Sequence, residues 1–438
     1  MNDIRSSIAI IKEKLRTSDI AKRMATGAFW SFTGTALAKF IVLVAGIACA
    51  HVLGKKEYGE FGMVRSTINM FVVFGFAGLG LTATKYISEF RTHQKERIAS
   101  IYLLTNGFAI VTGVIVTSFV LIFAPYLADH TLHASYLTPA IRIGGLLLFV
   151  TVINGAQQGT LSGFEDFKSI AINTLIGSIA ESIFMLLGGW LYGVTGAILG
   201  FGCGFIALYI TNYFAIRKNL QKSSIKISKT SFQKTDLKLL YKFSLPAALS
   251  SFMVAPVLWI IRAMLVQKDG FEELAVFEAA YQWRMILLFI PSAVSQIALP
   301  ILSSIANGNQ HRFRRVLNIN LFLNVSIALI LSLLVILSSP YIMRMYGKDY
   351  SDNYPLIILA ASTIFSSAAT VIGISNQSKA KMWISFSFNF VWAAELCILT
   401  YVYLNAHMGA SGVALAILSA YVLHSIAQIV YVASSRNG

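Results

Sequence analysis

The chain has 438 residues, of which 56% are hydrophobic and only 12% are charged, about half the charged fraction of ordinary soluble domains. A water-soluble chain of this length would divide into two or three domains, and it has too few charges to cover their surfaces. The composition therefore indicates an integral membrane protein. The net charge of +16 is attributed to basic loops beside anionic lipid and not to nucleic-acid binding.

Twelve apolar segments follow one another along the chain, and each is long enough to be a transmembrane helix. A helix crosses about 30 Å of hydrocarbon with roughly 20 residues. None of the segments shows the ten-residue alternation that is typical of barrel strands. The sequence thus predicts an all-α integral membrane protein with about twelve transmembrane helices. The predicted spans are about 27–53, 61–87, 98–126, 139–162, 169–190, 193–216, 239–266, 275–305, 316–339, 354–377, 383–404 and 409–433.

The segments outside the spans are short and define the domain boundaries. We expect a cytoplasmic surface helix or tail at 1–26, a first six-span lobe at 27–216, a basic cytoplasmic linker at 217–238, a second lobe at 239–433, and a cytoplasmic tail at 434–438. Residues 1–26 lack the apolar core and cleavage site of a secretory signal peptide.

The basic residues of the loops give the orientation of a multi-pass protein. Twenty-three lysines and arginines fall on the side of the two termini and the linker, whereas five fall on the opposite side. Because cytoplasmic loops carry the excess of basic residues, both termini are expected in the cytoplasm.

The two lobes repeat each other in sequence. Two copies of an even number of spans share one orientation, so we expect a pseudo-twofold axis along the membrane normal and a substrate site between the lobes near the midplane. This arrangement favours a carrier over a channel. The matching pairs, at offsets of 214 to 216, are Gly193 with Gly409, Gln94 with Gln310, Pro125 with Pro340, and Glu181 with Glu395.

Seven basic residues fall inside the predicted spans, and six of them lie on the first two spans of each copy. A charge at the bilayer centre costs a few kcal/mol, so it normally faces a wet cavity or a partner. Lys39 and Arg284 lie near the midplane, so a place in a central cavity is favoured over a structural role. Arg65 is intermediate in depth, and Arg262 either snorkels or lines the cavity. We predict that these four residues bind the substrate.

Three acidic residues are the candidates for ion coupling. Glu278 lies about two turns before Arg284 and is expected to pair with a cavity cation. Glu181 and Glu395 are repeat mates on the fifth and eleventh spans; they either form hydrogen bonds between helices or bind a coupling cation, a proton or sodium.

The surplus of cations suits an anionic substrate, and arginine suits phosphate through bidentate hydrogen bonds. The chain has no P-loop, GxSxG or HExxH motif. His130 and His133 have no convincing third ligand. We therefore expect neither an enzyme nor a metal or cofactor site.

One stretch of the sequence resembles a known family. It is similar to the N-terminal pattern of Wzx-type polysaccharide-biosynthesis flippases. The matching residues are Val52-Leu53-Gly54-Lys55-Lys56-Glu57-Tyr58-Gly59-Glu60-Phe61-Gly62, then Phe74-Gly75-Phe76-Ala77-Gly78-Leu79 and Ala83-Thr84-Lys85-Tyr86-Ile87-Ser88-Glu89-Phe90, with Trp30 and Ala38-Lys39 upstream. These belong to the multidrug/oligosaccharidyl-lipid/polysaccharide exporter superfamily.

The resemblance implies a fold, a substrate and a location. It implies a V-shaped pair of six-helix lobes in the bacterial cytoplasmic (inner) membrane. It implies an undecaprenyl-pyrophosphate-linked oligosaccharide that is turned to the outer leaflet for O-antigen, capsule or exopolysaccharide assembly, by ion-coupled alternating access. Membrane lipid is a further expected partner, with polysaccharide polymerase or assembly proteins as additional ones.

The main alternative is a multidrug cation antiporter of the same superfamily. Such a protein needs buried acids to attract organic cations, and the first two spans have none before Glu60. A lipid II flippase and a membrane enzyme of glycan assembly are weaker alternatives, because the former usually has fourteen spans and the latter a sizeable extramembrane loop.

Overall fold

The structure, a computed structural model, describes residues 19–76, 78–225, 253–305, 310–379 and 381–434. All regular elements within these ranges are helices. The first half comprises α2 (Asp19–Phe76), α3 (Leu79–His93), α4 (Lys95–Tyr126), two short helices (Leu127–Thr131 and Ser135–Leu137), α5 (Thr138–Gly163) and α6 (Phe167–Lys222). The second half comprises α9 (Val254–Asp269), α10 (Phe271–Leu287), α11 (Phe289–Ile305), α12 (Gln310–Arg344), α13 (Tyr354–Ser378), α14 (Met382–Asn405) and α15 (Gly409–Ser434).

Nine helices in the described ranges are long and apolar enough to cross a membrane. The chain is therefore a multi-pass, all-α membrane protein, as predicted. Two of the nine each contain a break that separates two predicted spans, at Gly54 in α2 and at Tyr192-Gly193 in α6. The predicted seventh span is described only from α9 onward. The total of twelve spans stays a prediction.

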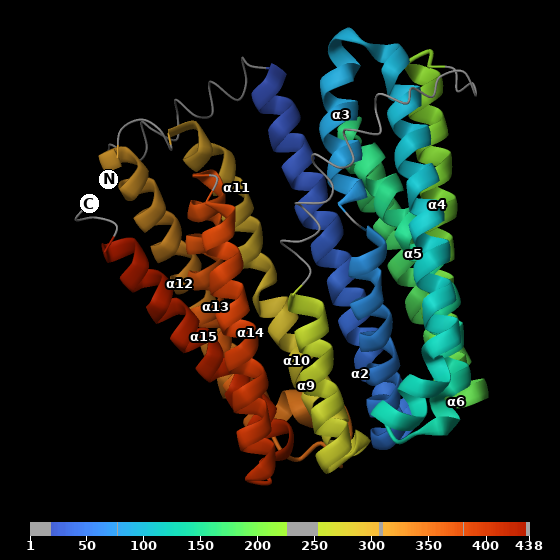
Figure 1. Ribbon diagram of the computed structural model, residues 1–438, viewed down its shortest axis with the longest axis vertical. Helices are drawn as coiled ribbons and strands as arrows, with labels where there is room; N and C mark the ends of the chain where they lie inside the picture. Colours follow the sequence, from blue (N-terminus) through green and yellow to red (C-terminus); the bar gives the residue numbers. More distant parts are fainter. Residues whose placement is uncertain (1–18, 77, 226–252, 306–309, 380, 435–438) are drawn as a thin grey trace.

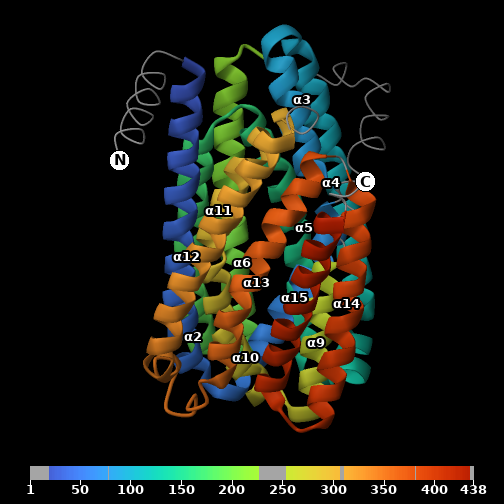
Figure 2. The same ribbon diagram turned by 90° about the vertical axis from the view of Figure 1, so that its left-hand side faces the viewer.

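The two halves form a V. In Figure 1, α2–α6 lie on one side and α11–α15 on the other, and the two groups converge at the end where α9 and α10 lie. Figure 2 looks onto the second half, with α11–α15 in front. At the narrow end, α10 and α9 pack against α2. The predicted V-shaped pair of lobes is confirmed.

Several predicted boundaries differ from those of the helices. The helix α6 runs to Lys222, into the predicted linker, because Ile216 and Leu220 are buried in an apolar cluster with Ile98. The predicted tail at 1–18, the linker beyond 225 and the tail at 435–438 lie outside the described residues.

Two predicted spans are interrupted. The sequence predicts the second as one continuous helix and the eighth as a helix kinked by Pro291 and Pro300. The second span divides into the end of α2 and α3, with Gly78 at φ +70° between them. The eighth span divides at Leu288 into α10 and α11. Pro291 follows this break, and it has no N–H to donate to the preceding turn. The interruptions therefore fall on equivalent spans of the two copies.

The backbone shows the internal repeat more sharply than the sequence pairs do. Gly54 (φ 76°, ψ 170°) and Gly270 (φ 85°, ψ −179°) adopt nearly the same conformation and are 216 residues apart. Each joins the first span of its copy to the second. A side chain at such a positive φ is strained, so glycine is needed at both turns. Gly193 and Gly409 form a second matching pair, with φ of +56° and +50°.

We predict that Gly54→Ala and Gly270→Ala each lower the stability of the purified protein by about 1–3 kcal/mol, the cost of a side chain in this backbone region. No atom lies within 4 Å of the Cβ that either substitution adds, so the effect would come from the backbone. Thermal unfolding in detergent measures it. Gly107→Ala is the matched control, since Gly107 is helical and also has open space around it. Equal unfolding temperatures in all three variants would contradict the prediction.

Candidate functional site

A buried carboxylate lies where the two halves converge. Glu278 of α10 is 3% exposed and accepts a hydrogen bond from Arg65 of α2 at 3.0 Å and another from Arg262 of α9 at 2.5 Å. Each arginine binds a different carboxylate oxygen. Taking such charges out of water costs several kcal/mol per ion unless they are paired. The cluster of three charges therefore stabilises itself, keeps a net charge of +1, and links the first half to the second.

The helices approach closely around this cluster because the residues opposite are small. Gly62 of α2 faces Glu278, and a Cβ there would lie 2.7 Å from Cγ of the glutamate. Gly59, one turn earlier, faces the carbonyl oxygen of Phe271 with no room for a side chain. Gly62 and Glu278 are themselves 216 residues apart, so the two copies meet here through equivalent positions of their second spans.

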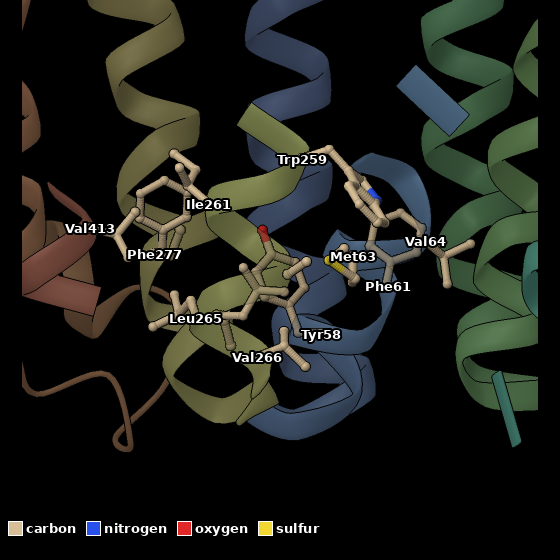
Figure 3. Packing of buried hydrophobic residues seen from close by; sticks show 14 of the residues in the cluster. Tyr58, Phe61, Met63, Val64, Trp259, Ile261, Leu265, Val266, Phe277 and Val413 are labelled. Carbon is tan, nitrogen blue, oxygen red and sulfur yellow. The ribbon is translucent and has the colours of Figure 1, made fainter. Parts of the chain in front are cut away.

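Other contacts close the same end of the V. Trp259 donates from Nε1 to Oγ1 of Thr67 at 2.9 Å, and Gln267 donates to the carbonyl oxygen of Thr131 at 2.7 Å. Apolar side chains from α2, α9 and α10 fill the space between them (Figure 3), including Phe61. We call this set of contacts, together with the Arg65–Glu278 pair, the closed end.

Lys39 lies in a pocket between the halves. The pocket has a volume of about 320 Å³ and is lined by Thr35, Ala38, Lys39 and Val42 of α2, Thr174 and Ser178 of α6, and Gln282, Met285 and Ile286 of α10. Its polar groups are one ammonium, three hydroxyls and one amide. None of these lining residues is acidic.

The ammonium group of Lys39 is uncompensated. Lys39 has no hydrogen bond or ion pair within the described part of the chain; its nearest aromatic neighbour is the ring of Phe289, 5.8 Å from Nζ. Gln282, which shares the pocket, is held in place from both halves: its amide donates to the carbonyl oxygen of Val42 at 3.1 Å and accepts from the Tyr346 hydroxyl at 3.0 Å. The pocket therefore offers an unpaired cation beside fixed polar groups, an arrangement that suits an oxyanion.

Arg284 lies inside the second half, apart from this pocket. It is 4% exposed, and it donates to the hydroxyls of Ser362 at 3.0 Å and Ser366 at 2.8 Å on α13. Its guanidinium also lies over the rings of Tyr281 and Tyr421. These partners are neutral, so they do not offset the charge of Arg284, and its Nε and Nη2 are already bound within the second half.

The structure does not gather the four predicted cations into one site, and only Lys39 lines the pocket. Glu278 pairs with cations, as expected, and its partners are Arg65 and Arg262 and not Arg284. Six residues turn a helix by about 600°, so Arg284 lies about 120° around α10 from Glu278. It consequently faces α13 instead of α2.

The other two acidic candidates have different surroundings. Glu181 of α6 is close enough to Arg65 for electrostatic attraction, although no hydrogen bond joins it to another described residue. Glu395 of α14 has a buried Oε2 without a hydrogen-bond partner among the described residues. Within the same residues, no group of three or more histidines, cysteines or acids could hold a metal ion.

The hydroxyl and amide groups of the site were not predicted from the sequence. Ser362 and Ser366 are spaced four residues apart in an apolar span, which places them on one helix face. That spacing was a usable signal for a buried polar partner. Nothing in the sequence indicated that Gln282, Thr174 and Ser178 would meet Lys39, because Gln282 lies on the eighth predicted span, Thr174 and Ser178 on the fifth, and Lys39 on the first.

We predict that Glu278→Gln destabilises the protein by about 3–5 kcal/mol, because it leaves two arginines buried without a counter-charge. Arg65→Gln should cost less, since Glu278 then keeps Arg262. The double variant Glu278→Gln/Arg65→Gln should recover part of the loss. Thermal unfolding of the purified variants gives the comparison. A Glu278→Gln protein as stable as Arg65→Gln would show that the cluster is not held by charge.

Comparisons with known proteins agree with this fold. The family model described as polysaccharide biosynthesis protein matches residues 24–306, more than half of the chain. The chain is 24% identical over 402 residues to the EPS I polysaccharide export inner membrane protein EpsE of Ralstonia nicotianae, covering 87% of each protein. It is 21% identical over 333 residues to a protein of Shigella flexneri to which O-antigen transport is provisionally ascribed, covering 74% of this chain and 77% of that one.

A solved structure gives the fold family. The chain superposes with a TM-score of 0.79 on an inward-facing multidrug resistance MATE family transporter of the MOP superfamily, at 16% identity, with 90% of this chain and 93% of that one covered. Identity at this level establishes the shared fold alone. The chain thus shares the fold of that transporter, and the polysaccharide-biosynthesis family predicted from the N-terminal pattern is confirmed by the family model. The chain belongs to the polysaccharide biosynthesis protein family.

Proposed function

We propose that the protein is a flippase for lipid-linked oligosaccharide. Its cargo would be a glycan on undecaprenyl pyrophosphate, moved from the inner to the outer leaflet of the bacterial cytoplasmic membrane for surface polysaccharide assembly. The relatives named for polysaccharide export and O-antigen transport support this cargo. The observation that carries the proposal is the unpaired ammonium of Lys39 in a pocket between the halves that has hydroxyls and no carboxylate.

The chemistry of the pocket fits a phosphate better than a cation. An ammonium group and nearby hydroxyls are donors that bind phosphate oxygens. The diphosphate would bind at Lys39 while the polyprenyl chain stays in lipid. The charge cluster at Glu278 and the charge of Arg284 add positive potential, so Arg65, Arg262 and Arg284 would attract the anion without contacting it in this state.

The multidrug cation antiporter remains the second candidate, because the fold is shared with a multidrug transporter. An organic cation needs an available carboxylate, and the Lys39 pocket offers none. Glu278 lies at the contact between the halves, and both of its oxygens are bound by arginine. The polarity of the site therefore argues against this function.

Transport would follow alternating access. The charge bias of the loops supports an orientation with the closed end at the outer surface and the termini in the cytoplasm. In that orientation the structure would be shut toward the outside. Release of cargo would require the Arg65–Glu278 pair and the Trp259–Thr67 bond to separate. A coupling proton or sodium ion would bind Glu181 or Glu395, whose carboxylates have no hydrogen bond from the described residues.

The first test is complementation of a strain that lacks the gene. Lys39→Gln should reduce surface polysaccharide at least tenfold, because a hydrogen bond to a charged group contributes about 1.5–3 kcal/mol and 1.4 kcal/mol is a factor of ten. Lys39→Arg should retain most of the activity. Arg142→Gln is the control, since Arg142 is an exposed cation on α5 that does not line the pocket.

Each variant is compared at equal membrane abundance, measured with a fluorescent C-terminal fusion. Full complementation by Lys39→Gln would remove the site assignment. Resistance to organic cations that depends on the gene, with no effect on polysaccharide, would favour the antiporter instead.

The second test addresses the closed end. The starting protein has its natural cysteines changed to serine. Thr131→Cys and Gln267→Cys then replace two residues that form a hydrogen bond between the halves. Arg65→Gln should lower the rate of cross-linking by a short bifunctional reagent severalfold, because one of the contacts between the halves is lost. Arg142→Gln should leave the rate unchanged. An unaltered rate in Arg65→Gln would show that this ion pair does not hold the outer end shut.

A further inference from the structure

A second positively charged pocket lies within the second half, away from the Lys39 pocket. It has a volume of about 170 Å³ and is formed by the beginning of α12, the end of α13 with the residues that follow it, and the end of α15. Three basic residues, Arg314, Lys379 and Lys381, line it. By the charge bias of the loops, this end of the molecule is the cytoplasmic one.

The basic residues of this pocket have no acidic partner in the part of the chain that the structure describes. The sequence contains no aspartate or glutamate between Glu278 and Asp349, and none after Glu395. Among the described residues, Lys379 lies over the ring of Phe313, with Nζ 4.3 Å from the centroid, and Lys381 donates to the Tyr431 hydroxyl at 3.4 Å. The pKa of Lys379 is lowered by burial and by the positive charges of Lys381 and Arg314. The three cations are thus close together and uncompensated.

A buried amide at the pocket also has no partner. Asn376 is 4% exposed and lines the pocket, and its Nδ2 has no hydrogen-bond acceptor within the described ranges. A buried donor without an acceptor costs about 1–3 kcal/mol. The pocket therefore combines three cations with an unused buried donor, and each of these groups is satisfied by an oxyanion.

The fold itself does not require these charges, because the other copy lacks them. At the offset of 216 that relates Gln94 to Gln310, Arg314 corresponds to Ile98 and Lys379 to Gly163. Ile98 is fully buried in an apolar cluster, and Gly163 packs so closely that a Cβ would lie 2.7 Å from Cβ of Ile87. The first half thus closes the equivalent region with apolar contacts and with the Arg91–Glu165 ion pair at 2.6 Å, whereas the second half has three cations without an acid among the described residues.

The surroundings of the pocket favour a phosphate that is carried by a lipid. Leu317, Leu321 and Ile429 form an apolar part of its lining beside the charges, and Ile429 is also half-exposed at the side of the helix bundle, at 51%. Basic pockets between transmembrane helices on the cytoplasmic side are typical sites for anionic lipid head groups. We propose that this pocket binds the phosphate of a membrane lipid at the inner leaflet, through Arg314, Lys379, Lys381 and the amide of Asn376.

The site is separate from the proposed substrate pocket and does not depend on it. Two lipids carry the required chemistry: an anionic glycerophospholipid and a polyprenyl diphosphate. Occupation by the former would make the pocket a lipid-binding site of the second half. Occupation by the latter would make it a first docking point for cargo before the Lys39 pocket.

Binding of lipid to the purified full-length protein tests the proposal. Native mass spectrometry would follow dioctanoyl phosphatidylglycerol, undecaprenyl diphosphate and, as the neutral comparison, dioctanoyl phosphatidylcholine. The variant Arg314→Gln/Lys379→Gln should lose about thirtyfold in affinity for at least one of the two anionic lipids, from about 1 kcal/mol per basic residue near the surface. Arg314→Lys/Lys379→Arg keeps the charges and should retain binding.

The control variant is Arg315→Gln/Lys218→Gln, which removes the same charge from exposed positions outside the pocket. A loss confined to phosphatidylglycerol identifies a glycerophospholipid site, and a loss confined to undecaprenyl diphosphate identifies a docking point for cargo. Equal affinities of the pocket variant and the control for both anionic lipids would overturn the proposal. Loss of binding in Lys39→Gln but not in the pocket variant would do the same, while leaving the proposed substrate pocket intact.

Discussion

The pairing of one buried glutamate with two arginines is the interaction on which the arrangement of the two halves depends. Glu278 binds Arg262 within its own half and Arg65 from the other. Ions buried in this way are stable only as a set. Small residues on α2, Gly59 and Gly62, let the helices come close enough for the set to form. The halves are therefore joined by an ion-paired contact. A neutral side chain in place of Glu278 would leave two arginines buried without a counter-charge.

This constraint also explains why the charges of the molecule have different roles. Arg65 and Arg262 neutralise an acid, and Arg284 is held by the hydroxyls of Ser362 and Ser366. Lys39 lines the pocket between the halves and has no hydrogen bond or ion pair to another residue that the structure describes. A transporter that binds an anion has to offer an uncompensated charge while the rest of its buried charges are satisfied. The distribution of partners thus separates the proposed binding residue, Lys39, from residues that hold the structure.

Much of the fold could be predicted from the sequence, and less of the site. The lengths of the apolar segments predicted the transmembrane helices, and the spacing of Gly193 and Gly409 indicated two copies. Depth along a span selected Lys39 and Arg284 as candidates, but depth does not determine which way a side chain faces. The partners of Arg284 and of Glu278 come from helices far apart in the sequence, so helix rotation and packing decide them. The break near Gly78 was missed because an apolar run hides an interruption in the helix, whereas Pro291 and Pro300 indicate a kink in the eighth span, where the break near Leu288 lies.

The central claim is that a positively charged space between the halves carries a lipid-linked diphosphate. Transport by the purified protein tests this claim most directly. The protein would be reconstituted into liposomes with a fluorescent polyprenyl-diphosphate oligosaccharide, and the fraction reached by a membrane-impermeant quencher would be measured over time. The protein should make the inner-leaflet lipid accessible, and an organic cation added in excess should not compete. Transport of the cation, with the labelled lipid remaining in its original leaflet, would contradict it.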